Sequence, residues 1–482
     1  MNILTVLRIV GVLLIWESVA MTPPLLLSIE EGIFLGWLGA VLITGATGGA
    51  LLLITPKKLT VDRRAGLVVV GFGWIAMVTA GSVPFVFSGV APSLIGAVFE
   101  SVSGFTTTGA TVFPTVEHLP RSILLWRSIS HWLGGMGIIV LGVAILPFIG
   151  MGGAQLFQAE APGISTDRLT PRIASTARLL WVVYATLTAV LFVLYQILGM
   201  GWFDALNHSM SALATGGFST RTQSMGAFSP AIQWVTIVFM ILAGTNFALH
   251  YRMIASRGRA WFRDIEWRVY ISVTLVASAI CFLSLFLTDT SWGVGETVRV
   301  AVFNVTAVIT TTGFATDDFG QWPVVGQVIL FGLMFMGAMG GSTGGGFKVV
   351  RVVVLAKNTW GEFRRALHPN AIIITRLGRT PIKSDVIMKV VGLFALFIGT
   401  HGIGTALLAA LGSDFVTAAS ASLAAMSSIG PGLGAVGPAS HYGDMHQLAQ
   451  LVLSILMLLG RLEFYTLLIL LLPDTWRLAS RR

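Results

Sequence analysis

The chain alternates between long apolar stretches and short polar breaks, and this pattern predicts a protein built from membrane-spanning helices. A helix needs about 20 apolar residues to cross the hydrocarbon core of a bilayer. Cutting the chain at its polar breaks gives ten such stretches. They lie near residues 3–27, 32–55, 65–88, 121–148, 178–198, 230–252, 268–288, 322–346, 384–411 and 445–471. We therefore expect an all-α polytopic membrane protein with about ten transmembrane helices.

The first stretch also has features of a secretory signal peptide. Arg8 is followed by an apolar run, and Ser18-Val19-Ala20 resembles a small-residue cleavage site. A second apolar stretch, 32–55, follows directly, and the topology of the whole chain needs both stretches. We predict that the first helix is retained, with cleavage of residues 1–20 as the alternative.

Basic residues gather in every second connection between the predicted spans. Most of the 30 lysine and arginine residues lie in segments 56–64, 151–178, 252–268 and 347–383 and in the tail after residue 471. Lysine and arginine near the ends of transmembrane helices stay on the cytoplasmic side. Ten spans with both termini in the cytoplasm place all five segments on that side, so we predict this orientation.

Composition agrees with a lipid environment and excludes several other classes. Of the 482 residues, 55% are hydrophobic and only 11% are charged, which is too few polar residues for the surface of a soluble protein of this length. The net charge of +9 could indicate nucleic-acid binding. Its location next to the spans makes it a topology signal instead, so we expect no nucleic acid. Cys281 is the single cysteine, which excludes a disulfide framework.

Four outer connections contain an apolar or amphipathic stretch followed by a short knot rich in glycine and hydroxyl residues. The knots occupy residues 106–111, 214–219, 310–315 and 427–432. If Gly109, Gly217, Gly313 and Gly430 are equivalent, they are 108, 96 and 117 residues apart, and Thr107, Thr215, Thr311 and Ser428 each lie two residues earlier. Gly216 is the alternative in the second knot, but the hydroxyl register favours Gly217. The chain thus predicts four repeats of helix, re-entrant pore helix, knot and helix around one central pore.

Knots of this composition suit the passage of a dehydrated cation. Non-helical backbone at membrane depth is tolerated where it lines a cavity or is buried in protein, and backbone carbonyls can replace the water around an ion. One copy is no more than a Gly-Thr turn, whereas four copies at similar spacing predict a selectivity filter. The predicted ion ligands are Thr107, Thr108, Gly109, Thr215, Gly216, Gly217, Thr311, Thr312, Gly313, Ser428, Ile429 and Gly430.

Over its whole length the chain resembles the TrkH-like members of the superfamily that includes Trk, Ktr and the plant HKT transporters. The resemblance rests on the four knots, on the Gly-rich run 336–348 and on Gly460-Arg461-Leu462-Glu463. It implies eight core helices, four pore helices and two extra leading helices in a bacterial cytoplasmic (inner) membrane. The fourth knot departs from the pattern, with Ile429 and Pro431 beside its glycine.

The same resemblance implies the substrate and the partners. Serine at the first filter glycine accompanies sodium preference in HKT relatives, so Gly109 implies that potassium is the substrate, with no cofactor in this chain. The resemblance also implies a homodimer with one pore in each protomer. A cytoplasmic, nucleotide-binding regulatory subunit of the TrkA type is expected to control it, so any nucleotide would lie on that partner.

The Gly-rich run predicts a gate below the filter. Six of the ten residues 337–346 are glycine, and glycine destabilises a helix by about 1 kcal/mol relative to alanine. The predicted gate residues are Gly340, Gly341, Ser342, Thr343, Gly344, Gly345, Gly346, Lys348 and Arg461. A flexible helix end is the alternative. A phosphate-binding loop is rejected because that motif needs Gly-Lys-Ser/Thr, and here Phe347 precedes Lys348 and Val349 follows it.

Arg461 lies near the middle of the last predicted span. Arginine at this depth costs at least about 2.5 kcal/mol on insertion and usually faces a cavity or a partner. We interpret it as an electrostatic barrier in the pore that also anchors the Gly-rich loop, with a buried ion pair to Glu463 as the alternative.

Other polar residues recur in the predicted pore helices. Glu100, His208 and Asn304 each lie nine residues before the filter glycine, whereas the fourth repeat has Ala421 there. We predict that these side chains anchor the helices by hydrogen bonds rather than contact the ion.

Two other functional classes are weighed against a gated conductor. A proton- or sodium-coupled potassium symporter would need a buried carboxylate, for which Glu463 is the candidate. An enzyme or ATP-driven pump would need a catalytic domain, and the longest cytoplasmic loop, 347–383, is too short for one. The predicted divisions are two leading helices in 1–60 and pore repeats in 61–150, 151–260, 261–365 (with the Gly-rich loop) and 366–482.

Overall fold

The structure is a computed structural model that describes residues 3–56, 63–144, 169–256, 258–288, 292–378 and 380–473. In this part of the chain, the secondary structure is helical except for one antiparallel hairpin of β1 (Arg376–Leu377) and β2 (Thr380–Pro381). The all-α prediction is confirmed. Much of the predicted basic segments 56–64 and 151–178, and the basic end of the tail, lies outside the described residues.

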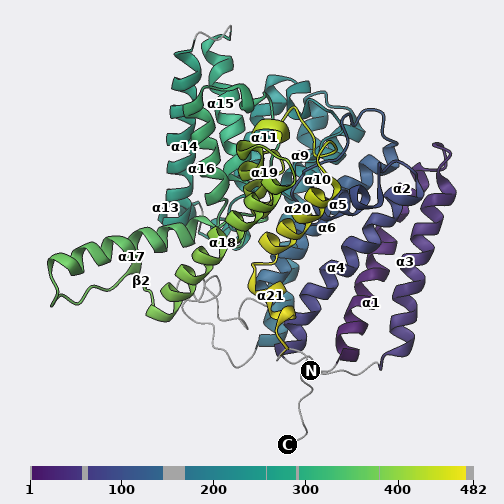
Figure 1. The fold of residues 1–482 in the computed structure, drawn as a ribbon, viewed down its shortest axis with the longest axis horizontal. Helices are drawn as coiled ribbons and strands as arrows, with labels where there is room; N and C mark the ends of the chain where they lie inside the picture. Colours follow the sequence, from purple (N-terminus) through teal and green to yellow (C-terminus); the bar gives the residue numbers. More distant parts are fainter. Residues whose placement is uncertain are drawn as a thin grey trace, which may run out of the picture.

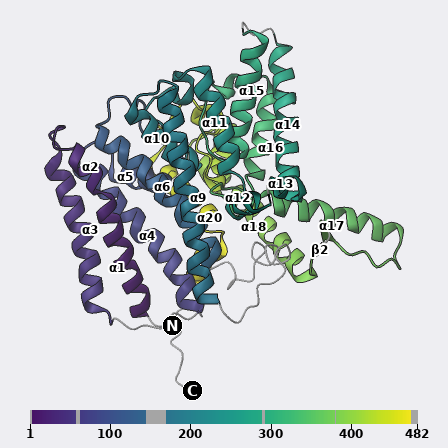
Figure 2. The same ribbon diagram turned by 180° about the vertical axis from the view of Figure 1, so that it is seen from behind.

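Two leading helices form one flank of the molecule (Figures 1 and 2). They are α1 (Ile3–Ala20), which continues into the short α2 (Thr22–Leu27), and α3 (Phe34–Ile54). Small residues let α1 and α3 touch, because a Cβ added to Gly48 would lie 2.8 Å from the carbonyl oxygen of Gly11.

A long helix, a short buried helix and a second helix then recur four times. The first repeat has α4 (Arg63–Phe87), α5 (Leu94–Phe105) and α6 (Arg121–Ala144), and the second has α9 (Leu169–Ile197), α10 (Trp202–Leu213) and α11 (Pro230–Ala243). The third has α14 (Ile265–Phe286), α15 (Val294–Ile309) and α16 (Val324–Met336), and the fourth has α18 (Ser384–Ala410), α19 (Phe415–Ser427) and α20 (Gln447–Arg461). We call α5, α10, α15 and α19 the pore helices.

Six helices in the described residues are long and apolar enough to cross a membrane, and a bent pair makes a possible seventh. The six are 3–27, 34–54, 68–87, 177–197, 265–286 and 384–410. Three other predicted spans correspond to α6, α16 and α20. α6 contains the charged residues Arg121 and Arg127, and α16 and α20 have fewer than 18 residues.

The second helix is interrupted in three of the four repeats. In the second repeat, the chain bends by 99° between α11 and α12 (Phe247–Ala255). In the third, α16 ends at Gly337 and α17 (Val349–Leu367) begins after Lys348. In the fourth, residues 462–464 separate α20 from α21 (Tyr465–Leu471), and Glu463 and Phe464 among them have positive φ. The prediction that 230–252 and 445–471 are each one continuous helix is therefore wrong. The break within 322–346 was predicted.

The second helices reach the pore helices closely because glycine faces the contact. A Cβ on Gly134 of α6 would lie 1.9 Å from the carbonyl oxygen of Phe105, at the end of α5. A Cβ on Gly460 of α20 would lie 1.8 Å from the carbonyl oxygen of Met426 in α19. These contacts place α6 and α20 directly against the ends of the first and fourth pore helices.

Shorter elements complete the chain. The outer loops contain the 3-10 turns η1 (Ser224–Ala227), η2 (Phe319–Gln321) and η3 (Gly434–Val436). On the opposite side, α13 (Arg259–Arg263) connects α12 to α14. Figure 1 shows α17 and the β hairpin extending away from the helical body.

Candidate ion pathway

All four pore helices end in the same backbone conformation. Thr107, Thr215, Thr311 and Ser428 have φ between 52° and 59°, a left-handed conformation that is uncommon outside glycine. Thr107 N donates to Gly104 O at 3.0 Å and Thr108 N donates to Ser103 O at 2.9 Å. The equivalent pairs of bonds in the other repeats measure 2.8–3.2 Å. This is the Schellman ending of a helix, here with a hydroxyl residue where glycine is usual.

Two residues further on, each knot contains a glycine with positive φ. The values are 81° for Gly109, 84° for Gly217, 72° for Gly313 and 96° for Gly430. Gly216 is not among the residues with positive φ. The backbone therefore has the same register as the hydroxyl residues, with Gly217 as the equivalent glycine of the second knot.

The four knots close a ring in the order in which they occur along the chain. In each knot, a Cβ on the glycine would collide with the carbonyl oxygen that precedes the glycine of the next knot. The distances are 2.0 Å from Gly109 to Gly216 O, 2.2 Å from Gly217 to Thr312 O, 1.7 Å from Gly313 to Ile429 O and 2.6 Å from Gly430 to Thr108 O. Since the last contact returns to the first knot, backbone from all four repeats surrounds one axis.

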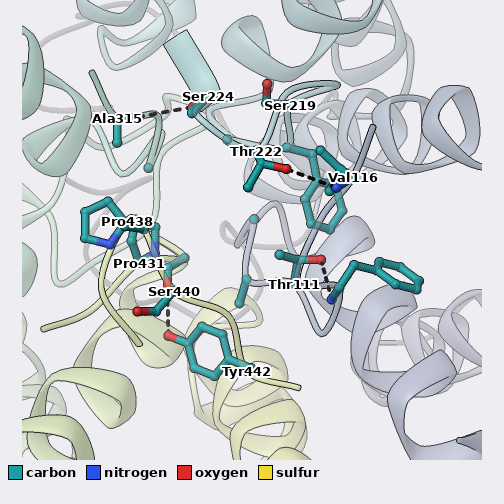
Figure 3. A pocket seen from close by; sticks show the side chains of 18 of the residues that line it. Thr111, Val116, Ser219, Thr222, Ser224, Ala315, Pro431, Pro438, Ser440 and Tyr442 are labelled. Atoms are coloured by element: carbon teal, nitrogen blue, oxygen red, sulfur yellow. Dashed lines mark hydrogen bonds between the residues drawn. The ribbon is translucent and has the colours of Figure 1, made fainter. Parts of the chain in front are cut away.

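A cavity of about 90 Å³ lies on the outer side of this ring and is lined by all four glycines (Figure 3). The loops around it are tied to one another. Val116 N donates to Thr222 Oγ1 at 3.1 Å, and Ala315 N donates to Ser224 Oγ at 3.3 Å. Tyr442 OH donates to the Gly430 carbonyl at 2.6 Å. The cavity is therefore bounded by loops of every repeat.

Polar residues of the first three pore helices bind the chain that follows the knot glycine, as predicted. Glu100 accepts hydrogen bonds from Thr111 Oγ1 at 3.1 Å and from Val112 N at 3.1 Å. His208 Nε2 pairs with Ser219 Oγ at 2.8 Å, and Asn304 Nδ2 donates to Thr316 Oγ1 at 3.0 Å. These bonds hold the outer part of each knot against its own pore helix.

In the fourth repeat, a residue that sequence reasoning missed makes the equivalent hydrogen bonds to the chain after the knot. Ser420, next to Ala421, donates to Leu433 O at 3.1 Å and accepts from Leu433 N at 2.8 Å. Ser420 lies ten residues before the knot glycine, and the equivalent residues of the other repeats lie nine before it, so aligning the repeats on their glycines does not find Ser420. The available signal was a hydroxyl residue next to the expected position.

Two buried residues of α6 join the first repeat to the second knot. Arg127 Nε lies 2.7 Å from Glu100 Oε1, and the guanidinium sits 3.9 Å from the ring centre of Phe218. His131 Nδ1 pairs with Gly104 O at 2.7 Å, while its Nε2 accepts from Phe218 N at 3.2 Å. The side chains of α6 thus fix the ring where repeats one and two meet.

The buried Arg127–Glu100 pair predicts a large loss of stability when it is broken. Arg127→Ala leaves the Glu100 carboxylate buried without its cation, a change that typically costs about 3–5 kcal/mol. The control is Arg221→Ala, whose partner is Asp204 and whose side chain is 46% exposed, so its loss should cost less than about 1 kcal/mol. Thermal unfolding in detergent is expected to show a much lower Tm for Arg127→Ala alone. Equal Tm values for both variants would contradict this role.

The Gly-rich loop between α16 and α17 lies against the ends of three pore helices. Thr343 Oγ1 donates to Leu213 O at 3.0 Å, at the end of α10. Gly345 N donates to Thr311 Oγ1 at 2.6 Å, and a Cβ on Gly345 would lie 2.1 Å from Ser427 O. The loop therefore covers the ring on the side opposite the outer cavity.

Arg461 holds this loop through its backbone. The side chain is 3% exposed, and Nη1 donates to Thr343 O at 2.7 Å. Glu463 instead pairs with Arg351 of α17 at 2.8 Å, so the alternative pairing of Arg461 with Glu463 is wrong. Side chains two residues apart on a helix point to different faces, and α20 ends at Arg461, before Glu463.

A small cavity of about 30 Å³ lies on the inner side of the loop. Lys348, Arg351, Arg461 and Glu463 line it, together with Phe347 and Phe464. Lys348 Nζ donates to the carbonyl oxygen of Gly344. Three basic side chains and one acidic side chain give this inner side a net positive charge.

Glu266 also contacts the loop and was missed by sequence reasoning. It lies in the first turn of α14, and its Oε1 accepts hydrogen bonds from Gly340 N at 2.7 Å and Val350 N at 3.1 Å. The available signal was an acidic residue within the basic segment 252–268. Nothing in the sequence connects it to a loop more than seventy residues away.

In the part of the chain that the structure describes, no group of three or more histidine, cysteine, aspartate or glutamate side chains could hold a metal ion. The oxygens gathered around the ring come from backbone and hydroxyl groups. Such oxygens suit a weakly bound alkali cation, which must leave the site as readily as it enters.

The fold and the ring define a class of membrane protein in which one chain closes four helix-and-loop repeats into a ring around one axis. A family model described as "Cation transport protein" matches residues 38–475. The chain belongs to this family, the TrkH family.

Relatives support this assignment over the full length. The chain is 39% identical to "Trk system potassium uptake protein TrkH" of Halomonas elongata, across 99% of this chain and 100% of the relative. It is 37% identical to the protein of the same name from Escherichia coli, with coverage of 99% and 100%. The crystal structure of the potassium transporter TrkH from Vibrio parahaemolyticus superposes with a TM-score of 0.91 at 37% identity, covering 99% of this chain and 100% of that chain.

Proposed function

We propose that this protein takes up potassium across the cytoplasmic membrane through the ring of four knots. This proposal rests mainly on one observation: each knot glycine is in close contact with a carbonyl oxygen of the next knot, so that the four knots form a closed ring. The proposed ion ligands are the twelve predicted residues, 107–109, 215–217, 311–313 and 428–430, through their carbonyl and hydroxyl oxygens. The names of the full-length relatives agree with potassium as the substrate.

The pore helices favour a cation at the ring. Each of them ends at its knot, and a helix C-terminus carries a partial negative charge. Four such ends meet at one axis, so they add a favourable potential without a full negative charge that would trap the ion. Carbonyl oxygens and helix ends together replace the hydration shell of potassium.

The Gly-rich loop is the proposed gate, held closed by Arg461. The loop covers the inner side of the ring, and the buried guanidinium donates to Thr343 O. A positive charge at this place opposes the passage of a cation, and the hydrogen bond fixes the loop across the path. Opening would require the loop to move away from the ends of the pore helices.

The basic segments support an orientation and a docking surface, and the family resemblance supports the partners. We propose that both termini are cytoplasmic and that the protein is a homodimer. Two leading helices lie in residues 1–60, and the four repeats that follow occupy 61–150, 151–260, 261–365 and 366–482. A TrkA-like regulatory subunit would dock on the basic segments 151–178, 252–268 and 348–383. The last two include α13, α17 and the β hairpin.

Flux measurements test this proposal. The purified protein is reconstituted in potassium-loaded liposomes, and uptake of rubidium-86 is measured with excess external sodium or potassium and with a protonophore. We expect uptake that is blocked by potassium, spared by sodium and indifferent to the protonophore. Uptake that stops with the proton gradient would establish a symporter instead. No uptake by either the wild type or the Arg461→Ala variant would contradict the proposed function.

A further inference from the structure

The two ends of the Gly-rich loop are held by a single carboxylate oxygen. Glu266 Oε1 accepts from Gly340 N, near the start of the loop, and from Val350 N, in the first turn of α17. The Glu266 side chain is 8% exposed. Backbone N–H groups at a helix N-terminus lack partners within the helix and favour a negative charge. Glu266 therefore satisfies the first turn of α17 and pins the loop at the same time.

The same part of the loop is held from another side by the bend between α11 and α12. Phe247 N donates to Gly341 O at 3.1 Å, and Met339 N donates to Gly244 O at 3.1 Å. A Cβ on Gly341 would lie 2.9 Å from Asn246 Nδ2. The break between α11 and α12 thus frees backbone groups, which form hydrogen bonds with the Gly-rich loop.

Both attachments belong to one stretch of chain. We call α12, α13 and the first turn of α14, residues 247–266, the control arm; the structure describes all of it except residue 257. Its first residue, Phe247, bonds to Gly341 and its last residue, Glu266, bonds to Gly340. A displacement of the arm therefore acts on two adjacent residues of the loop.

Ring contacts connect the arm internally. His250 Nε2 pairs with Leu242 O at 2.9 Å across the bend, and its ring lies 5.7 Å from that of Trp261. Trp261 in turn stacks on Trp267 of α14 at 5.6 Å. These contacts join α12, α13 and α14, so a displacement at one end of the arm is passed to the other.

We propose that the control arm sets the position of the gate, with Glu266 as the positioning residue that latches the Gly-rich loop closed. This inference rests on the proposed function of the loop as a gate. Moving the Glu266 carboxylate away would leave Gly340 N and Val350 N without an acceptor and would release the loop. The exposed Arg259 and Arg263 of α13 give a cytoplasmic partner a place to push on the arm.

The latch is tested with Glu266→Gln and Glu266→Ala in the reconstituted full-length protein. Hydrogen bonds to a charged acceptor are about twice as strong as those to a neutral one. We therefore expect basal rubidium-86 uptake to rise about fivefold in Glu266→Gln and about tenfold or more in Glu266→Ala. The matched control is Glu296→Gln, in the first turn of α15, whose carboxylate pairs with Arg299 at 3.2 Å on the outer side. Its uptake should equal that of the wild type.

A second measurement reports the position of the loop without flux. Cys281 is replaced by serine, Ser342 is replaced by cysteine, and the rate of labelling by a water-soluble maleimide is followed in detergent. Ser342 is 4% exposed, so labelling should be slow in this background and several-fold faster when Glu266→Gln is added. Glu296→Gln should leave the rate unchanged.

The outcomes separate the latch from the proposed function. Unchanged or reduced uptake together with unchanged labelling in Glu266→Gln would overturn the latch, since a purely structural role lowers flux and does not raise it. If Glu266→Ala fails to fold, Glu266→Gln alone decides. If the wild type shows no potassium-competed uptake, the proposed function is at fault, and the labelling rate still decides the latch.

Discussion

Replacing Arg461 by alanine is expected to raise basal rubidium uptake by the purified protein between about tenfold and a hundredfold. The guanidinium is buried against the Gly-rich loop, beside the proposed ion path, and carries a full charge. Two unit charges about 8 Å apart repel by about 2 kcal/mol at an effective dielectric constant of about 20. A barrier of that size corresponds to about thirtyfold in rate. Loss of the hydrogen bond from Arg461 to Thr343 O also frees the loop.

The control for this measurement is Arg365→Ala. Arg365 lies on α17 and forms an exposed ion pair with Glu362 at 2.5 Å, so its removal changes the net charge equally but leaves the path untouched. Uptake by this variant should match that of the wild type. An unchanged flux in well-folded Arg461→Ala would remove both the barrier and the anchor from the account of gating.

Replacing Gly313 by alanine is expected to lower the preference for potassium over sodium by at least about tenfold. The added Cβ would lie 1.7 Å from Ile429 O, and the φ of 72° is unfavourable for alanine. The third and fourth knots must then move apart, which takes carbonyl oxygens away from the ion. The preference is measured as the ratio of sodium to potassium concentrations that halve rubidium uptake.

Gly332→Ala is the matched control for this substitution. Gly332 lies in α16 of the same repeat, and no atom is within 4 Å of its added Cβ. Alanine also favours a helix more than glycine does, so the variant should fold and keep the selectivity of the wild type. If Gly313→Ala keeps the same concentration ratio, close contact between adjacent knots does not determine selectivity.

The sequence predicted the ring well because its signals are local. A glycine with positive φ and a hydroxyl residue two positions earlier are needed in every repeat, whatever surrounds them. That requirement shows as a repeated spacing in a single sequence. The same reasoning predicted the break near Gly337, where glycines are dense enough to end a helix without help from other contacts.

The other helix breaks depend on distant contacts and could not be predicted in the same way. α11 ends before a single glycine, Gly244. The break is stabilised because the freed backbone forms hydrogen bonds with the Gly-rich loop, almost a hundred residues later in the chain. Glu463 and Phe464 adopt positive φ although neither is glycine. The ion pair of Glu463 with Arg351 and the packing of Phe464 against Phe397 compensate for this conformation. Tertiary contacts override local preference at such places.

Glu266 and Ser420 show a further limit of sequence reasoning. Each is an ordinary polar residue whose role depends on what lies opposite it in the folded chain. Glu266 binds a loop from another part of its own repeat, and Ser420 takes over a position shifted by one residue. An acceptor for two backbone N–H groups has no sequence motif of its own, so only coordinates identify it.

The closure of the ring within a single polypeptide has a consequence for how its selectivity can change. In a channel assembled from four identical subunits, one codon alters all four sides of the filter together. Here Gly109, Gly217, Gly313 and Gly430 are encoded separately, and each touches a different neighbour, with contact distances that already differ. A single mutation therefore alters one of the four contacts between adjacent knots and leaves the other three intact. On the proposed function, ion preference can therefore be changed one contact at a time, and the fourth knot, with Ile429 and Pro431, already differs in sequence from the other three.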